Sequence, residues 1–216
     1  YFINNEFLAL QENQPLGKFL APIEFEIGEK AYAMGCATCA DGWGSPNDPP
    51  DVFGEAIKHW DIDFFINIAA SYWIPGKNQA RIQNFSHQAQ RNRKPIIYVN
   101  QVGVQNNGST IYTYDGNSCI YDAAGRIVAK AKAWEEDLLI APIPTNCYEP
   151  EVKVKEDNDT AHLYQALVYG IKNFSQSCSI ERAVLGLSGG IDSAVAACLV
   201  TEAFGAENVL AVNMPS

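Results

Sequence analysis

The 216-residue sequence has no apolar run long enough to cross a membrane and no segment with the composition of a secretory signal peptide. It is also poor in basic residues, with 15 Lys and Arg against 25 Asp and Glu and a formal net charge of −10. This charge argues against broad binding to nucleic acid or to a membrane surface, so we expect neither as a partner. Internal repeats and low-complexity tracts are absent too.

The cysteines lack the regular spacing of a disulfide framework. This distribution predicts reduced thiols in a cytoplasmic protein. Apolar residues make up 47% of the chain, which allows a sizeable core. The six cysteines are Cys36, Cys39, Cys119, Cys147, Cys178 and Cys198, the last of them in a helix that we expect to be buried.

The C-terminal part has the pattern of a strand, a glycine turn, a helix and a second strand. Residues 183–187 form a short apolar run, and residues 208–214 form another. Between them, residues 193–204 are apolar nearly all round and end before Gly205, a typical helix stop. Such a βαβ unit predicts parallel, buried strands.

The turn of this unit, SGGIDS, is suited to an anion. A glycine turn before a helix directs backbone N–H groups at one point, which favours phosphate. Gly189 and Gly190 allow close approach, and Ser188 and Ser193 can donate hydrogen bonds. The loop has no Walker lysine, so Asp192 is interpreted as a ligand of Mg²⁺ that neutralises the phosphates. The alternative is a ligand-free turn capped by Ser188 and Asp192.

Residues 188–193 resemble the pyrophosphate loop of the ATP pyrophosphatases, which adenylate a substrate and release pyrophosphate. The resemblance implies the start of a doubly wound parallel-sheet domain, with ATP as substrate and Mg²⁺ on Asp192. It implies that ATP contacts the following residues: Gly186, Leu187, Ser188, Gly189, Gly190, Ile191, Asp192, Ser193 and Met214.

A change in composition divides the chain after Trp134, where acidic residues and prolines become frequent. Asn158 or Asp159 can then cap a helix with an apolar face. We expect a first domain over 1–145, a linker over 146–157 and a second domain over 158–216, all within a longer protein. The apolar face comprises Tyr164, Leu167, Val168, Ile171 and Phe174.

The first part has an α/β pattern. Residues 64–70 and 95–102 are apolar and strand-like, and a polar segment with helical spacing lies between them at 77–93. Three further strand-like stretches over 108–131, broken by turn residues, predict a β-meander. We therefore expect a layered α/β sandwich here.

Cys36 and Cys39 form a C-x-x-C pair within this part. A thioredoxin-like redox pair is disfavoured because residues 41–46 include Asp, two Gly and Pro, which do not extend a helix from Cys39. A zinc site is disfavoured because neither a second pair nor a histidine cluster is present. A single nucleophilic cysteine at a strand end and two inert, buried cysteines remain as alternatives.

The sequence CADGW at 39–43 resembles the Cys-Glu-Asp-x-Trp elbow of nitrilase-type glutamine amidohydrolases. Further segments resemble the same family: NIAASY at 67–72, GK at 76–77 with Arg81, VNQVG at 99–103 and DGNS at 115–118. The resemblance implies a nitrilase-like αββα sandwich, present in part, and a cysteine that forms a thioester with glutamine. The implied residues are Cys39 as nucleophile, Glu6 as a supporting carboxylate, and Tyr1, Ser71 and Lys77 as glutamine ligands.

A nitrilase-type amidase followed by a pyrophosphatase loop resembles the arrangement of the bacterial glutamine-dependent NAD⁺ synthetase family. The resemblance implies that glutamine, ATP and deamido-NAD⁺ are substrates and that the protein is a homo-oligomer. Ala40 and Gly42 depart from the amidase pattern, which raises the alternative of a catalytically weakened paralogue. The other alternative is a different pyrophosphatase-loop enzyme, such as a tRNA-thiolating protein that uses the cysteine pair.

Overall fold

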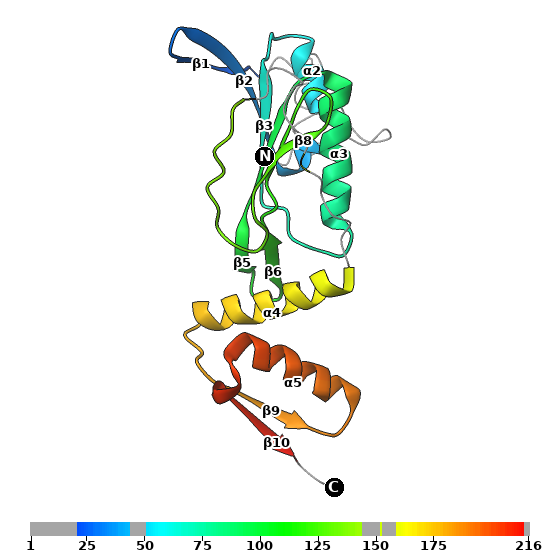
Figure 1. Cartoon of the computed structure of the whole chain (residues 1–216), viewed down its shortest axis with the longest axis vertical. Helices are drawn as coiled ribbons and strands as arrows, with labels where there is room; N and C mark the ends of the chain where they lie inside the picture. Colours follow the sequence, from blue (N-terminus) through cyan, green and yellow to red (C-terminus); the bar gives the residue numbers. More distant parts are fainter. Residues whose placement is uncertain (1–20, 44–50, 144–151, 153–158, 214–216) are drawn as a thin grey trace.

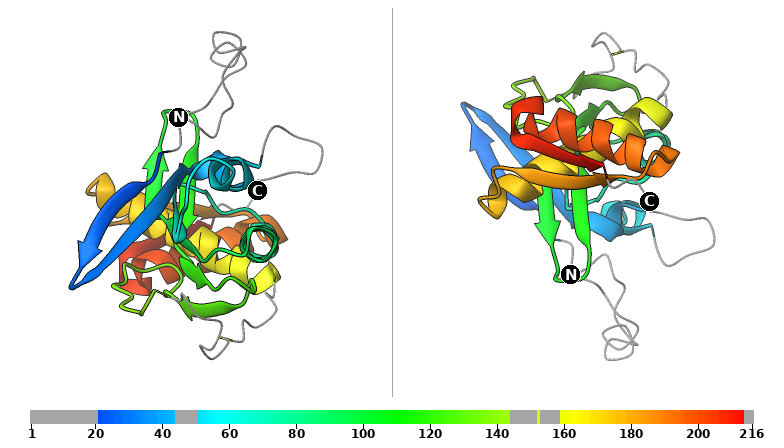
Figure 2. Two further views of the ribbon diagram at one scale, coloured as in Figure 1. Left: turned by 90° about the horizontal axis from the view of Figure 1, so that it is seen from above. Right: turned by 90° about the horizontal axis from the view of Figure 1, so that it is seen from below.

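The computed structural model of the protein describes residues 21–43, 51–143, 152 and 159–213. Its first part contains a six-stranded mixed sheet with the order β1-β2-β3-β4-β7-β8 (Figure 1). The central strands β2, β3 and β4 are parallel, and the outer strands are antiparallel to their neighbours. The β1–β2 hairpin extends away from the rest of the sheet (Figure 2). The strands are β1 (Ile23–Ile27), β2 (Lys30–Thr38), β3 (Phe64–Ala69), β4 (Ile96–Asn100), β7 (Cys119–Tyr121) and β8 (Ile127–Lys130).

Two helices cover one face of this sheet (Figure 1). Buried aromatic side chains contribute to the core between them and the sheet. Phe53 packs against Phe65 with ring centroids 4.6 Å apart, and Phe85 packs against Tyr98 at 4.5 Å. Burial of each such side chain is worth about 1.5–3 kcal/mol. This layer of helices on a parallel-centred sheet confirms the α/β class. The helices are α2 (Val52–Ile57) and α3 (Lys77–Asn92).

The opposite face of the sheet is also apolar but remains open to solvent. Ile68 on β3 is 56% exposed and Val99 on β4 is 39% exposed. Of the four layers of an αββα sandwich, the described residues thus provide one helical layer and one sheet.

The expected strand over 95–102 is instead two strands in different sheets. β4 ends at Asn100, Gln101 donates its N–H to the carbonyl of Ala69, and the chain then leaves the sheet. The expected meander over 108–131 is likewise divided: β6 pairs with β5 in a separate sheet, whereas β7 and β8 pair with each other in the large sheet. The separate two-stranded sheet consists of β5 (Val102–Asn106) and β6 (Ile111–Asp115).

The second part begins with a long helix, α4, which lies between the β5–β6 sheet and the remaining elements (Figure 1). Trp134 packs on Tyr169 of α4 with ring centroids 5.3 Å apart. A Cβ added at Gly170 would lie 3.2 Å from the hydroxyl of Thr113, so this glycine lets α4 approach β6. The elements are α4 (Asp159–Ser177), β9 (Ala183–Leu187), α5 (Ile191–Phe204), a 3₁₀ turn η3 (Ala206–Asn208) and β10 (Val209–Asn213).

The predicted βαβ unit is confirmed, since β9 and β10 are parallel and α5 connects them. α5 begins at Ile191, two residues before the predicted start. The predicted burial is wrong for the described residues: α5 has no buried residue, Cys198 is exposed, and Leu210 is 61% exposed. The reason is that α5 lies between α4 and the two strands, with few other described elements packed against it (Figure 1). No helix in the described ranges has the length and apolar character of a membrane span.

The predicted apolar face of α4 is only partly buried. Tyr164 and Leu167 are each 43% exposed, whereas Ala166 and Ser175 are buried. The residues of this helix that are buried are therefore small ones.

Candidate functional site

Cys39 lies at a sharp turn between β2 and the helical layer. The strand ends at Thr38, and residues Cys39–Gly42 form a single 3₁₀ turn, η2. Cys39 itself has φ +42°, which a residue with a side chain adopts at a cost of about 1–3 kcal/mol. The Asp41 carboxylate stabilises the turn by accepting hydrogen bonds from the N–H and the hydroxyl of Thr38, at 3.0 and 2.9 Å. The strained turn thus presents Cys39 at a strand end.

Two asparagines hold the backbone of this elbow. The side-chain amide of Asn84, on α3, donates to the carbonyl of Gly42 at 2.7 Å. Asn67, on β3 and fully buried, donates to the carbonyl of Cys39 at 3.4 Å. These bonds link the turn to its neighbouring strand and to the covering helix.

Gly42 fits this position because no side chain has space there. A Cβ at Gly42 would lie 2.6 Å from the amide nitrogen of Asn67 and 2.7 Å from the ring of Phe85. The ring of Trp43 then packs edge-on against Phe85, with centroids 6.4 Å apart. Gly42 departs from the amidase pattern, and the packing of Asn67 and Phe85 beneath the turn explains why a glycine is needed there.

Cys39 opens into a pocket of about 360 Å³ that also contains Ser71 and Lys77. Ser71 follows the end of β3, and Lys77 is the first residue of α3. The structure thus brings together the predicted nucleophile and two of the three predicted glutamine ligands. The residues that line the pocket are Cys39, Ala40, Trp43, Ala70, Ser71, Tyr72, Lys77 and Ala80.

Lys77 provides the positive charge of the pocket. Its ammonium nitrogen lies 4.5 Å from the ring centroid of Tyr72 and 5.5 Å from that of Trp43, which are cation–π distances. Burial lowers the pKa of Lys77, and the neighbouring Arg81 guanidinium lowers it further. The pocket therefore presents a fixed, partly desolvated cation between two aromatic rings, suited to a carboxylate.

The two cysteines of the C-x-x-C pair are not equivalent. Cys36 lies within β2, is not part of the pocket lining, and has a thiol whose pKa is raised by partial burial. No group of metal-binding side chains occurs among the residues that the structure describes. These findings favour a single nucleophile at Cys39 over a redox pair or a zinc site.

Three predicted site residues lie outside the described ranges. These are Tyr1, Glu6 and Met214. Ala40, which replaces the glutamate of the amidase motif, is exposed and lines the pocket without adding a polar group.

The predicted phosphate loop lies between β9 and α5 and is open to solvent. Gly189 has φ +83°, and nothing lies within 4 Å of the position that a Cβ would occupy there. The hydroxyls of Ser188 and Ser193 lie 3.2 Å apart, and Ser193 donates to the carbonyl of Gly190 at 2.9 Å. The loop thus gathers two hydroxyls and a helix N-terminus around open space, as an anion site requires.

Asp192 does not cap the helix. The N-cap of α5 is Gly190, and no side chain makes a capping hydrogen bond there. Asp192 is exposed in the first turn, and no described residue forms a hydrogen bond or an ion pair with it. A carboxylate without a described partner in this loop fits Mg²⁺, which proteins commonly bind through one or two carboxylates together with substrate phosphates.

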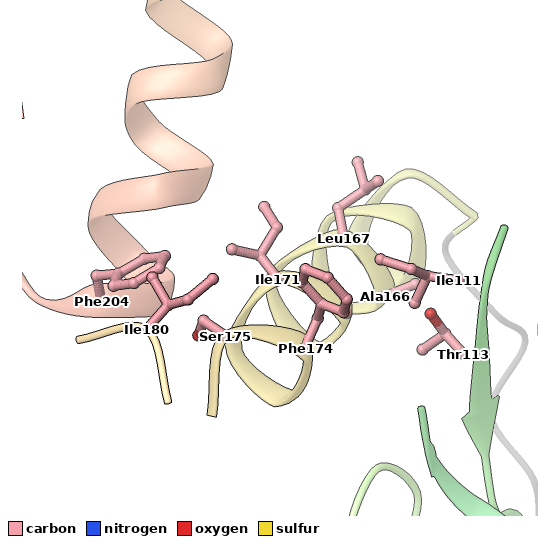
Figure 3. A pocket seen from close by; sticks show the side chains of 10 residues that line it. Ile111, Thr113, Ala166, Leu167, Ile171, Phe174, Ser175, Ile180 and Phe204 are labelled. Atoms are coloured by element: carbon pink, nitrogen blue, oxygen red, sulfur yellow. The ribbon is translucent and has the colours of Figure 1, made fainter. Parts of the chain in front are cut away.

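A second cavity, of about 330 Å³, lies between α4, β6 and the end of α5 (Figure 3). Its walls are mainly aliphatic and aromatic, and the Ser175 hydroxyl is already used in a hydrogen bond to the carbonyl of Lys172. This cavity therefore provides apolar contacts rather than groups that could catalyse a reaction. Its lining comprises Ile111, Thr113, Ala166, Leu167, Gly170, Ile171, Phe174, Ser175, Ile180 and Phe204.

Two family models match successive parts of the chain. Residues 58–149 match the carbon-nitrogen hydrolase model, and residues 163–216 match the NAD synthase model. The first match begins after Cys39, so it does not include the elbow.

Those relatives share one name and are much longer than this chain. The glutamine-dependent NAD(+) synthetase of Synechocystis sp. is 37% identical over 195 residues, which cover 87% of this chain and 34% of the relative. The protein of the same name from Aquifex aeolicus is 31% identical over 249 aligned positions, covering 100% of this chain and 42% of the relative. The chain thus spans about a third of the length of the Synechocystis relative.

Solved structures give the same result. Glutamine-dependent NAD⁺ synthetase from Acinetobacter baumannii, in complex with ADP, is 30% identical with a TM-score of 0.75. That comparison covers 90% of this chain and 35% of the other. The enzyme of the same name from Cytophaga hutchinsonii, at 20% identity and a TM-score of 0.61, shares the fold over 84% of this chain and 26% of its own. The chain therefore joins a carbon-nitrogen hydrolase segment to an NAD synthase segment and is similar along most of its length to glutamine-dependent NAD⁺ synthetases.

Proposed function

We propose that the protein is a ligase that makes NAD⁺ from deamido-NAD⁺, with glutamine as nitrogen donor and ATP as energy source. The observation that carries this proposal is the presence of two complementary sites in one chain. A strained cysteine faces a cationic pocket at Cys39 and Lys77, and an open phosphate loop with a free carboxylate lies at Asp192.

In the first site, the Cys39 thiolate attacks the side-chain amide carbon of glutamine. Ammonia leaves, a thioester forms, and water then releases glutamate and restores the thiol. Lys77 pairs with the α-carboxylate of glutamine, and Ser71 donates a hydrogen bond to the bound substrate. Tyr1 is the third glutamine ligand. Glu6 is a supporting carboxylate near Cys39.

In the second site, residues 186–193 and Met214 bind ATP. Backbone N–H groups at Gly189 and Gly190, together with the hydroxyls of Ser188 and Ser193, hold the phosphates. Asp192 holds Mg²⁺, which neutralises phosphate charge when bound. Deamido-NAD⁺ attacks the α-phosphate, pyrophosphate leaves, and ammonia then displaces AMP. The ADP complex of the Acinetobacter baumannii relative supports a nucleotide site in this family.

The proposed domains follow from these two sites. The amidohydrolase domain occupies 1–145, a linker occupies 146–157, and the synthetase domain begins at 158 and includes the loop. We also propose a cytoplasmic homo-oligomer. Its substrates are glutamine, ATP and deamido-NAD⁺, with no nucleic acid or membrane partner.

Isotope transfer tests the coupled activity of the full-length protein. With glutamine labelled with ¹⁵N at the side-chain amide, the proposal predicts label in the nicotinamide group of the NAD⁺ formed, along with AMP and pyrophosphate. Unlabelled ammonium serves as the competing donor.

A second candidate is a synthetase with an inactive amidase domain, favoured by the apolar Ala40 in the pocket. That protein would form NAD⁺ from ammonium while transferring no label from glutamine.

A further inference from the structure

One buried side chain fixes the backbone of Ser71 in the Cys39 pocket. Asn100, at the end of β4, accepts a hydrogen bond from the N–H of Ser71 at 2.8 Å. Its amide nitrogen donates to the carbonyl of the same residue at 3.2 Å. Both backbone groups of Ser71 are therefore held by a side chain that is only 8% exposed.

The same amide connects Ser71 to a buried ion pair. Its nitrogen also donates to the carbonyl of Gly116 at 3.0 Å, so both of its hydrogens are used. Arg81 donates to that carbonyl at 3.4 Å and to the Asp115 carboxylate at 2.6 Å. Asn117 donates to the other Asp115 oxygen at 2.7 Å, and the Arg81–Asp115 pair is almost fully buried.

The network connects two segments that line the pocket. Arg81 follows Lys77 by four residues on α3, so the two lie on the same face of that helix. At the other end of the network, Ser71 itself lines the pocket. The elbow at Cys39 is held separately, by the Asn67 and Asn84 amides.

We infer that Asn100 is a positioning residue that sets where Ser71 lies relative to Lys77 and thereby the affinity for glutamine. This inference rests on the proposed binding of glutamine in the Cys39 pocket. Removal of the amide leaves the N–H and the carbonyl of Ser71 without this partner in a buried place, whereas the Gly116 carbonyl keeps its bond from Arg81. The Ser71 loop must therefore shift to restore its hydrogen bonds. Because the elbow has its own supports, the shift weakens substrate binding more than it slows the attack by Cys39.

The test uses the full-length enzyme with Asn100→Asp and Asn100→Ala. Asp keeps the size of the side chain and the acceptor for Ser71 N–H but has no amide hydrogens. The matched control is Asn92→Ala, because Asn92 is also 8% exposed but bonds within α3 to the carbonyl of Gln88 at 3.0 Å. Glutamine hydrolysis, ammonium-driven NAD⁺ formation and thermal unfolding are measured for each.

Both Asn100 variants should raise KM for glutamine by roughly tenfold or more, with kcat within about twofold and the ammonium-driven rate unchanged. Asn92→Ala should lower thermal stability and leave KM at the wild-type value. Unchanged KM in both Asn100 variants, an equal rise in Asn92→Ala, or failure of even Asn100→Asp to fold would overturn the inference. A wild-type enzyme without glutamine hydrolysis would instead overturn the proposed function itself.

Discussion

The side-chain amide of Asn84 donates a 2.7 Å hydrogen bond to the carbonyl of Gly42 and so fastens the nucleophile turn to α3. This bond joins two segments that are 42 residues apart in the sequence. It connects a turn of four residues to a rigid helix, which keeps the strained backbone of Cys39 in place.

Asn84→Ala should therefore lower kcat/KM for glutamine hydrolysis by roughly tenfold, because small displacements of a nucleophile are costly to catalysis. Stability should fall by only about 1 kcal/mol, the usual contribution of one hydrogen bond. Steady-state kinetics and thermal unfolding measure the two effects. The matched control is Gln83→Ala, an exposed neighbour on the same helix, which should leave both unchanged. Equal kinetics in the two variants would contradict a role for Asn84 at the elbow.

As pH rises, glutamine binding should weaken at a lower pH than it would with a lysine of ordinary pKa at position 77. Burial and then Arg81 lower the pKa of Lys77, and only the protonated amine can pair with a carboxylate. KM for glutamine should thus be low below that lowered pKa and rise as pH passes through it. A pH series of KM checks this, and in Lys77→Gln the KM should be high at every pH and lack this rise.

Lys58 provides the control for that series, because its side chain is largely exposed and outside the pocket lining. Lys58→Gln should keep the wild-type pH profile of KM. If the pH profile of KM in Lys77→Gln matched that of the wild type, a role for Lys77 in glutamine binding would be contradicted.

Asp192→Asn should reduce pyrophosphate release by roughly a hundredfold or more with ammonium as nitrogen donor, since metal assistance is worth several kcal/mol. Asn keeps the size of the side chain but removes the charge that would hold Mg²⁺. The measurement is pyrophosphate release across a Mg²⁺ titration, with Glu202→Gln, an exposed acid on the same helix, as control. The same turnover and Mg²⁺ dependence in Asp192→Asn and wild type would exclude a metal role.

Much of this arrangement could be predicted from the sequence. The phosphate loop was visible because glycines, hydroxyls and a carboxylate follow an apolar strand, and strand ends are where α/β sites gather. The same rule indicated Ser71, which follows the apolar strand 64–69. Local pattern therefore indicated the residues that we propose as ligand contacts.

The supporting residues were harder to predict, because their partners are backbone atoms. Asn67, Asn84 and Asn100 each bond to a carbonyl from a segment far away in the sequence, and no side-chain pattern records such partners. A buried polar residue within an apolar strand, such as Asn67, was the one available signal. The division of 95–102 between two sheets was hidden because Val102 resumes the apolar run after only two polar residues, Asn100 and Gln101.

The most direct test of the proposed function compares Cys39→Ala with Cys36→Ala in the full-length enzyme, using glutamine and ammonium as alternative nitrogen donors. Cys39→Ala should abolish NAD⁺ formation from glutamine and retain the ammonium-driven reaction, because adenylation occurs at the separate loop around Asp192. Cys36→Ala should be nearly unchanged with both donors, since Cys36 lies outside the pocket lining. Loss of the glutamine reaction in Cys36→Ala with full activity in Cys39→Ala would contradict the assignment of the nucleophile.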